Sequence, residues 1–257
     1  MSADATVSTA APYSRSKPTP AIIVGSLVFT AWMYLSMAVL ALVCLPTLLG
    51  PRRFTLEIVR LWAAGVLGAL RLFCGVKVEV RGREHMPTAG GFIAAKHFAM
   101  LDTIAPLLVL PDAAYVLKRE LMRLPFYGWY ARKLDMLPID RAGGAGALRL
   151  LVHGARERME EGRQVLIFPE GTRREPGDAP DYKPGVAGLY RELQTPCTPL
   201  ATNSGLFWPA HGFLRFPGTV VFEFLEPIPP GLKRGAFMAQ AQARIEEAST
   251  RLLNEAA

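Results

Sequence analysis

The feature that most constrains the fold of this chain is a long apolar run close to its start. The run extends from Ala21 to Gly50 and contains no charged residue. A helix needs about 20 apolar residues to cross a bilayer, and this run is longer. Pro46 and Gly50 predict that the helix ends near Leu45. Because the run is too long for an ordinary signal-peptide core and no clear small-x-small cleavage site follows, we expect an uncleaved membrane-attaching helix.

A second apolar stretch runs from Phe54 to Cys74 and is interrupted by Glu57, Arg60 and Arg71. These charges are more typical of a helix that lies in the membrane interface than of one that spans. Two arrangements therefore stay open: the first helix spans, or the two segments form a hairpin within one leaflet. Basic residues flank the first segment on both sides, so the distribution of Lys and Arg gives no orientation.

Composition divides the chain into three parts. Residues 1–20 are rich in Ser, Thr, Ala and Pro, which is typical of a disordered head. Residues 21–75 carry the two apolar segments and are predicted to be membrane-attaching helices. From Val76 onward, short β-rich runs alternate with helical patterns, so we assign residues 76–257 to an α/β domain.

The third part predicts a layered sheet. Strand candidates are 76–80, 92–95, 114–117, 136–139, 165–168, 199–203 and 219–224. An apolar helical face recurs over 148–159 and stops at Gly162, and a last helix is expected over 235–254. Strands alternating with helices imply an α/β fold with a mixed, largely parallel sheet of about seven strands flanked by helices.

Charge and cysteine content narrow the classes of partner. The net charge is +7, which suits nucleic acid, lipid headgroups or a phosphorylated substrate. The mean hydropathy of +0.21 favours a membrane, and a nucleic-acid-binding module would leave the apolar N-terminal part unexplained. Cys44, Cys74 and Cys197 are odd in number and widely spaced, which argues against a disulfide framework or a zinc site. No tight metal-ligand motif is present, and we expect neither metal nor cofactor.

A histidine and an aspartate form the first candidate site. Residues 91–97 predict a strand that ends in His97, and Asp102 precedes an apolar helix expected to run through Leu110. Five residues on a regular helix would set the two side chains about 140° apart, so they meet only if the chain bends between strand and helix. Asp102 could then accept the Nδ1 proton and leave Nε2 as a base. Alternatively, Asp102 only caps the helix and His97 is an ordinary loop residue.

A second candidate site follows the strand predicted at 165–168. Glu170, Gly171, Arg173 and Arg174 lie where that strand ends, and α/β sheets bind ligands at the carboxyl ends of their strands. Arginine pairs bidentately with phosphate, and glycine lets the backbone approach a ligand closely. Glu170 could accept a hydrogen bond from a hydroxyl or hold an arginine. The alternative is a solvated turn with incidental charges.

Two weaker clusters follow the same logic. Asp140 and Arg141 come after the strand at 136–139, and Lys183 precedes a helix expected to open near Gly185. Helix starts attract phosphate, so we expect Lys183 to contact substrate there. The glycines at 143–146 are interpreted as a flexible loop before a helix.

These motifs occur together in an order that resembles the glycerolipid acyltransferase family, and the bacterial 1-acyl-glycerol-3-phosphate acyltransferases in particular. The matching blocks are His97-x4-Asp102, 139–141, 168–173 and the strand at 196–203. The segment 118–129 also looks like the connecting segment of that family. The resemblance covers about residues 76–230.

The resemblance implies a glycerol-3-phosphate acyltransferase-like fold and specific roles. His97 would be the general base and Asp102 would orient it. The remaining motif residues would bind glycerol phosphate: Asp140, Arg141, Glu170, Gly171, Thr172 and Arg173. The family needs no metal and forms no acyl-enzyme.

The implied reaction transfers a fatty acyl group from acyl-CoA or acyl-carrier protein to the sn-2 hydroxyl of 1-acyl-glycerol-3-phosphate, giving phosphatidic acid. The implied partners are membrane lipids such as lysophosphatidic acid, and the implied location is the cytoplasmic face of a bacterial inner membrane. One alternative is an acyltransferase for another lysolipid such as lyso-ornithine lipid. The other is a catalytically silent lipid-binding membrane protein, but its expected mark, a broken His-x4-Asp, is not found.

The chain also departs from the family pattern. Lys96 and Ala99 stand where the family often has Asn and Ser, and the strand at 196–203 lacks the usual valine-rich form. The loss of the serine puts the identity of the substrate in doubt more than the type of reaction. Lys96 could reach the substrate phosphate or the donor, or it could be a surface charge.

Overall fold

The computed structural model describes residues 13, 15, 17–140 and 142–256, so most of the predicted head, and Arg141, lie outside the described residues. Its centre is a seven-stranded sheet in the order β1-β7-β6-β2-β5-β3-β4. The strands are β1 (Val76–Arg81), β2 (Gly91–Ala95), β3 (Ala113–Lys118), β4 (Leu137–Ile139), β5 (Gln164–Ile167), β6 (Cys197–Thr202) and β7 (Gly218–Phe224). Of the strand pairs in the described part of the chain, β6–β7 is antiparallel and the others are parallel. The predicted mixed, largely parallel sheet is confirmed, and each strand begins and ends within two residues of its predicted bounds.

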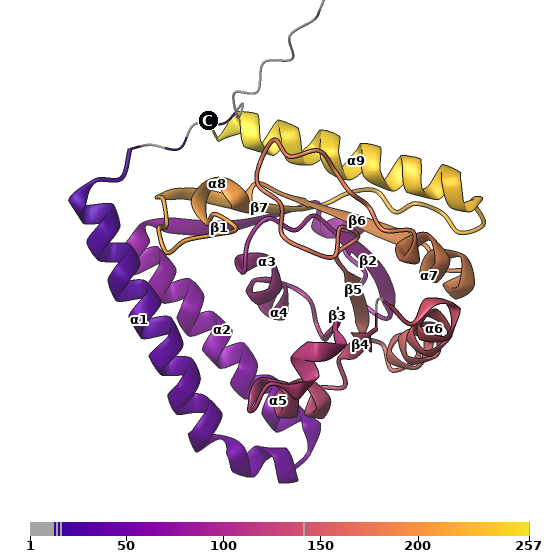
Figure 1. Ribbon diagram of the computed structural model, residues 1–257, viewed down its shortest axis with the longest axis horizontal. Helices are drawn as coiled ribbons and strands as arrows, with labels where there is room; N and C mark the ends of the chain where they lie inside the picture. The colour runs from indigo at the N-terminus through magenta and orange to yellow at the C-terminus, as the bar shows by residue number, and fades with distance from the viewer. Residues whose placement is uncertain (1–12, 14, 16, 141, 257) are drawn as a thin grey trace, which may run out of the picture.

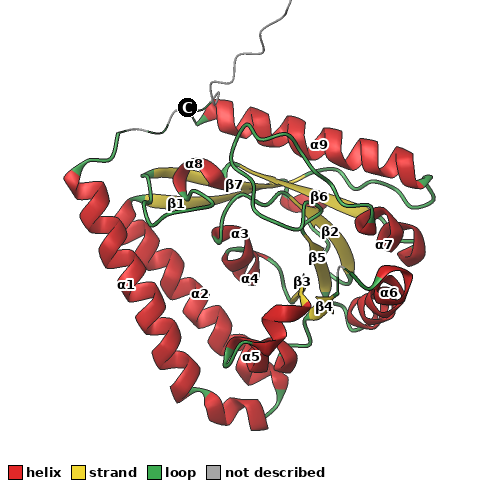
Figure 2. Ribbon diagram, viewed as in Figure 1, coloured by secondary structure: helices red, strands yellow, loops and turns green. Residues whose placement is uncertain are grey.

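Helices cover both faces of this sheet (Figure 2). The longer ones are α1 (Pro20–Val43), α2 (Arg52–Cys74), α5 (Tyr127–Lys133), α6 (Gly144–Glu160), α7 (Gly185–Leu193) and α9 (Arg234–Glu255). The short ones are η1 (Leu45–Leu49), η2 (Arg83–His85), α3 (Leu101–Ile104), α4 (Pro106–Val109), η3 (Arg119–Arg123) and α8 (Ser204–Phe207). In Figure 1, α9 runs along one side of the sheet, and α3, α4 and α2 lie on the other.

Two predictions about helices are wrong in detail. The segment after Asp102 is not one helix through Leu110 but two single-turn helices, because Pro106 has no N–H to donate to the preceding turn. The glycines at 143–146 do not all form a loop. Helix α6 already begins at Gly144, since the tertiary packing of its apolar stripe outweighs the low helix propensity of glycine.

Alternate residues of each central strand face different layers. In β2, Ile93 and Ala95 pack with α2, α3 and α4, whereas Phe92 and Ala94 pack with α6, α7 and α9. Successive side chains of a strand point to opposite faces, so this division continues to the residues that follow β2. We call the face covered by α2, α3 and α4 the hairpin face, after the hairpin of α1 and α2 that lies on it, and the face covered by α6, α7 and α9 the α9 face.

The first two helices form an antiparallel hairpin on the hairpin face (Figure 1). Helix α1 begins at Pro20, where the Thr19 hydroxyl accepts a hydrogen bond from the N–H of Ile22 (3.3 Å). It buries a stripe that includes Phe29 and Met33 and leaves most of its other apolar side chains exposed. Among the described residues it is the one helix that is long and apolar enough to cross a membrane.

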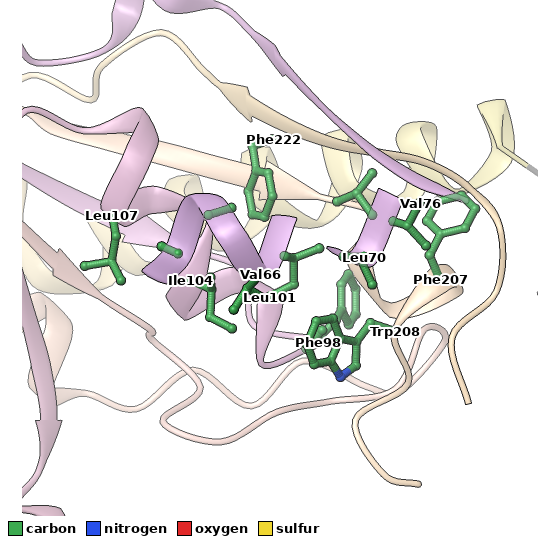
Figure 3. Packing of buried hydrophobic residues seen from close by; sticks show 14 of the residues in the cluster. Val66, Leu70, Val76, Phe98, Leu101, Ile104, Leu107, Phe207, Trp208 and Phe222 are labelled. Atoms are coloured by element: carbon green, nitrogen blue, oxygen red, sulfur yellow. The ribbon is translucent and has the colours of Figure 1, made fainter. Parts of the chain in front are cut away.

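Helix α2 belongs to the core of the sheet. Its residues Val66 and Leu70 are fully buried beside Leu101 and Ile104 of α3, as Figure 3 shows. The helix ends at Gly75, whose φ of +67° is the left-handed conformation that glycine adopts without strain. The hairpin therefore stacks in layers: α2 covers the sheet, and α1 covers α2.

Candidate functional site

The end of β2 sends two consecutive polar side chains to opposite faces. His97 continues the series of Ile93 and Ala95 and lies on the hairpin face, and Lys96 continues the series of Phe92 and Ala94 toward the α9 face. Both the imidazole and the ammonium are largely shielded, with side-chain exposures of 13% and 1%. The two residues therefore serve different environments although they share a peptide bond.

A tight turn brings His97 and Asp102 together. The distance between His97 Nδ1 and Asp102 Oδ2 is 3.2 Å. The same oxygen accepts hydrogen bonds from the backbone N–H groups of Phe98 and Ala99, each at 2.7 Å. Asp102 thus stabilises the bend and contacts the histidine, whereas the alternative that it caps the helix is wrong, because Asp102 lies inside α3, whose N-cap is Met100. A carboxylate at Nδ1 favours the tautomer with its proton there, which leaves Nε2 able to accept one.

The loop after β5, residues 168–174, packs directly against this turn. The ring of Phe168 stacks on the His97 imidazole with centroids 4.0 Å apart and planes inclined by 20°. The N–H of Arg174 donates to the carbonyl of His97 (2.9 Å). Gly171 takes a φ of +66°, which lets the loop reverse direction between these contacts. The structure therefore brings the first and second predicted sites together.

Within this loop, Glu170 points to the α9 face. Its side chain is 1% exposed, and its Oε1 lies 3.0 Å from Lys96 Nζ. Burial raises the pKa of the Glu170 carboxyl, and Lys96 opposes that shift. Lys96 also contacts Glu246 of α9 at 2.8 Å. The interpretation of Lys96 as a surface charge is wrong, because the ammonium is buried among carboxylates.

The two arginines of the loop differ. Arg174 is 2.7 Å from a carboxylate oxygen of Asp181 and 4.0 Å from Glu170. Arg173 has no carboxylate partner among the described residues. Thr172 is exposed. Arg173 is therefore the arginine of this loop whose charge is left for a ligand.

Residues 77–203 match the sequence profile of the acyltransferase family. This segment forms an acyltransferase-family domain. The chain is 34% identical over 163 residues to a 1-acyl-sn-glycerol-3-phosphate acyltransferase of Pseudomonas aeruginosa, with 63% of each chain covered, so the match spans less than two thirds of that relative. It is 29% identical over 210 residues to 1-acyl-sn-glycerol-3-phosphate acyltransferase alpha of Bos taurus, which covers 80% of this chain and 71% of that one.

The acyltransferase fold is also found in a solved structure. The 1-acyl-sn-glycerophosphate acyltransferase PlsC from Thermotoga maritima superposes with a TM-score of 0.71 over 88% of this chain and 95% of that one, at 24% identity. The predicted family and the predicted fold class are therefore confirmed.

Two predicted binding residues of this chain, Asp140 and Lys183, have charged partners within the protein. Asp140 follows β4, which is three strands from β2 in the sheet, or about 14 Å at the usual spacing. Its carboxylate accepts hydrogen bonds from Arg119 (3.3 Å) and from the N–H of Ala142 (3.0 Å). Lys183 is half-exposed and paired with Asp181. The structure therefore does not bring Asp140 to the histidine, whereas Lys183 lies beside the loop that packs on it, with its N–H donating to the carbonyl of Pro169 (2.9 Å).

A buried arginine on the hairpin face was not predicted. Arg215 stacks its guanidinium on Trp208, 4.1 Å from the ring centroid, and donates to the carbonyls of Gly212 and Leu214. Among the described residues it has no carboxylate within ion-pair distance. Burial lowers its pKa to about 10, and the charge of Arg173 acts in the same direction. The only signal in the sequence is a lone arginine between Leu214 and Phe216.

The segment before α1 also reaches loop 168–174 and its continuation. The guanidinium of Arg15 pairs with the Glu175 carboxylate and donates to the carbonyl of Gly205 (2.9 Å). A hollow of about 310 Å³ beside this pair is lined by Arg15, Glu175 and part of the segment 209–216. His97 is not among the described residues that line it, so this hollow is separate from the histidine.

Proposed function

We propose that this chain transfers a fatty acyl group from acyl-CoA or acyl-carrier protein to the sn-2 hydroxyl of 1-acyl-glycerol-3-phosphate, giving phosphatidic acid. The observation that carries the proposal is the contact of 3.2 Å between His97 Nδ1 and Asp102 Oδ2, beside a loop that leaves Arg173 without a carboxylate. The names of the relatives support the same acceptor.

In the proposed reaction, Nε2 of His97 accepts the proton of the acceptor hydroxyl. The alcohol oxygen then attacks the thioester carbonyl, and the tetrahedral intermediate expels the thiolate. The imidazolium returns its proton to that thiolate, so the histidine ends neutral. A thioester is already activated, so the reaction as written needs neither an acyl-enzyme nor a cofactor. A base held in this way accelerates such a step by roughly 100- to 10,000-fold.

Asp102 would act through His97 rather than on the substrate. Its Oδ2 faces Nδ1, which keeps the proton on that nitrogen and stabilises the imidazolium when it forms. The stacked ring of Phe168 limits rotation of the imidazole. The histidine is therefore oriented before any substrate arrives, which removes part of the entropic cost of the reaction.

Arg173 is the proposed ligand of the acceptor phosphate. Its neighbour Arg174 donates its N–H to the His97 carbonyl, so the backbone fixes the position of Arg173 relative to the base. Arginine binds phosphate through two parallel hydrogen bonds. Asp140, Arg141, Thr172, Gly171 and Lys183 remain predicted binding residues.

The exposed apolar face of α1 supports attachment to a membrane. Leu35 and Val43 are 67% and 69% exposed, and a water-facing strip of this kind is typical of a lipid-binding surface. We propose that the hairpin holds the catalytic domain at the cytoplasmic face of a bacterial inner membrane, where the lysolipid acceptor is dissolved.

The test is an acceptor screen with purified full-length protein and a labelled acyl thioester. Wild type, His97→Ala and His153→Ala are offered 1-acyl-glycerol-3-phosphate, lyso-ornithine lipid and other lysolipids. His153 is a matched control because its side chain is 75% exposed on α6. We expect phosphatidate from wild type and His153→Ala, and a loss of about 100- to 10,000-fold for His97→Ala.

The other outcomes contradict the proposal in different ways. Transfer that persists unchanged in His97→Ala would show that the assigned base is wrong. Acylation of another lysolipid alone would favour the second acceptor class. Binding of lysolipid by wild type without transfer to any acceptor would favour a catalytically silent lipid-binding protein.

A further inference from the structure

A buried lysine next to the catalytic histidine has carboxylates on two sides. Lys96 is 2% exposed, and its Nζ lies 3.0 Å from Glu170 Oε1 and 2.8 and 3.0 Å from the two oxygens of Glu246. Its ammonium also lies 4.9 Å from the ring centroid of Phe98. A buried charge is tolerated only when it is paired and hydrogen-bonded, so this cluster is a specific construction rather than an incidental contact.

The cluster joins four segments of the chain. Lys96 directly follows β2, Glu170 lies in loop 168–174, and Glu246 projects from the middle of α9. Glu246 also accepts a hydrogen bond from the Tyr182 hydroxyl, which precedes α7 (2.9 Å). The most distant of these segments in sequence, α9, therefore has a direct polar connection to the residue before the histidine.

We propose that Lys96 is a positioning residue, which holds His97 and loop 168–174 against α9 through its ion pairs with Glu170 and Glu246. This inference rests on the proposed function only where it is tested by enzyme activity; the structural part of the test does not depend on it. It assigns Glu170 to the same task, as a partner of Lys96 rather than as a ligand of the acceptor.

The geometry explains how such a cluster reaches the active site. Loop 168–174 contacts His97 at both ends, through the Phe168 ring and through the Arg174 N–H. Glu170 lies between these two contacts, and its ion pair fixes the middle of the loop to β2. Arg173 is carried by the same loop. Loss of these ion pairs would let the His97 imidazole and Arg173 shift relative to each other, and a shift of about 1 Å can lower the rate 100-fold.

Lys96 itself has no path to substrate. It lies on the α9 face, enclosed by the two glutamates, whereas His97 lies on the hairpin face. A substitution in the cluster should therefore act through alignment of the base. Such a substitution should lower kcat per folded molecule and make loop 168–174 more mobile. It should not reduce the amount of folded protein.

The test uses Glu246→Gln in the full-length protein, with Glu247→Gln as the matched control. Both variants remove one carboxylate from α9, but Glu247 is exposed and has no hydrogen-bond or ion-pair partner among the described residues. Glu246→Gln keeps the side-chain shape and a hydrogen-bond acceptor for Tyr182. We expect kcat, normalised to the folded fraction, to fall about tenfold in Glu246→Gln and to stay unchanged in Glu247→Gln.

A second readout does not depend on activity. Hydrogen exchange of the backbone amides in 168–174, including the Arg174 N–H that bonds to His97, should be several-fold faster in Glu246→Gln than in Glu247→Gln. In a Lys96→Met background, Glu246→Gln should cause no further loss in either readout, because its partner is gone and one of the two facing carboxylates is removed.

Equal behaviour of the two glutamine variants would overturn the proposal, as would a fall in kcat without faster exchange of the loop. The two proposals can also be told apart. If wild type lacks acyl transfer but Glu246→Gln still speeds hydrogen exchange in loop 168–174, the proposed function is wrong, and the positioning role of the Lys96 ion pairs is still supported.

Discussion

The two faces of the sheet treat their buried cations in opposite ways. On the α9 face, Lys96 lies between Glu170 and Glu246, so its charge is neutralised inside the protein. On the hairpin face, the Arg215 guanidinium stacks on Trp208 and, among the described residues, donates hydrogen bonds only to backbone carbonyls. The first arrangement suits a structural clamp, and the second leaves positive charge on the side of the sheet where the histidine lies.

The difference between the two faces follows from the alternating direction of side chains along β2. Phe92 and Ala94 belong to the core cluster under α9, whereas Ile93 and Ala95 belong to the one under α2. His97 and Lys96 keep this order, so the proposed base and the residue proposed to position it lie at adjacent positions on opposite faces. Substitutions on one face should therefore affect chemistry, and those on the other should affect alignment and stability.

The largest expected effect separates these two faces directly. Asp102→Asn keeps the size of the side chain but removes the carboxylate that faces His97 Nδ1. We expect kcat to fall by roughly 100- to 10,000-fold, because the imidazole loses both its tautomer preference and the charge that stabilises its protonated form. Steady-state kinetics with 1-acyl-glycerol-3-phosphate measures this.

Thermal unfolding supplies the control for that variant. Asp102 also accepts hydrogen bonds from the N–H groups of Phe98 and Ala99, and the side-chain oxygen of asparagine can still accept them. Asp102→Asn should therefore remain folded, whereas Asp102→Ala should lower the Tm as well as the activity. Comparable kcat values for Asp102→Asn and Glu246→Gln would break the comparison between the faces.

A second prediction concerns the outer layer of the hairpin face. An aspartate in place of Leu35 puts a charge on the exposed side of α1, at a cost of about 3 kcal/mol in a bilayer, or roughly 100-fold in the membrane partition coefficient. Leu150→Asp is the control, since Leu150 is 76% exposed on α6 of the other face. Flotation of both variants with vesicles of bacterial phospholipid measures partition. Equal release of the two would argue against attachment through α1.

The structure also changes the meaning of a larger deletion. Removal of residues 1–75 is expected from the sequence to release the α/β domain from membranes. Helix α2, however, buries Val66 and Leu70 against the sheet, so the truncated chain would expose the core it shares with α3 (Figure 3). A point substitution on α1 is therefore the cleaner test of attachment.

Most of the fold was predictable because it rests on local pattern. Each strand is a short β-rich run bounded by turn residues, and α6 repeats its apolar positions at helical spacing. Pattern alone could not give the order β1-β7-β6-β2-β5-β3-β4, since strand neighbours are chosen by packing between distant segments. It also did not show that Pro106 divides the helix after Asp102.

The site was predictable only where its residues are close in sequence. The turn that joins His97 to Asp102 spans a few residues, and the bend between strand and helix was expected. The Lys96–Glu246 pair links residues 150 positions apart, and an isolated glutamate on an amphipathic helix gives no sign of its partner. Asp140 is predicted as a site residue because it follows a strand, but local pattern could not show that this strand lies three positions from β2 in the sheet.

The third prediction compares two adjacent arginines. Arg173→Ala should raise the KM for the lysolipid acceptor about tenfold, because a hydrogen-bonded contact with a charged group contributes about 1.5–3 kcal/mol. Arg174→Ala should change that KM less, since Arg174 is already paired with Asp181 at 2.7 Å. An acceptor that lacks the phosphate should be insensitive to Arg173→Ala. If Arg174→Ala had the larger effect on KM, the phosphate ligand would be assigned to the wrong residue.

The smallest expected effect returns to the two buried cations. Arg215→Met should cost only about 1–2 kcal/mol of unfolding free energy, because two carbonyls lose a donor but no carboxylate is left unpaired, and methionine still packs on Trp208. Lys96→Met should cost about 3–5 kcal/mol, since Glu170 and Glu246 would face each other without a cation. Urea unfolding of both variants measures the difference. Equal costs would mean that the charge of Arg215 is compensated within the fold, and the contrast between the two faces would then be one of packing alone.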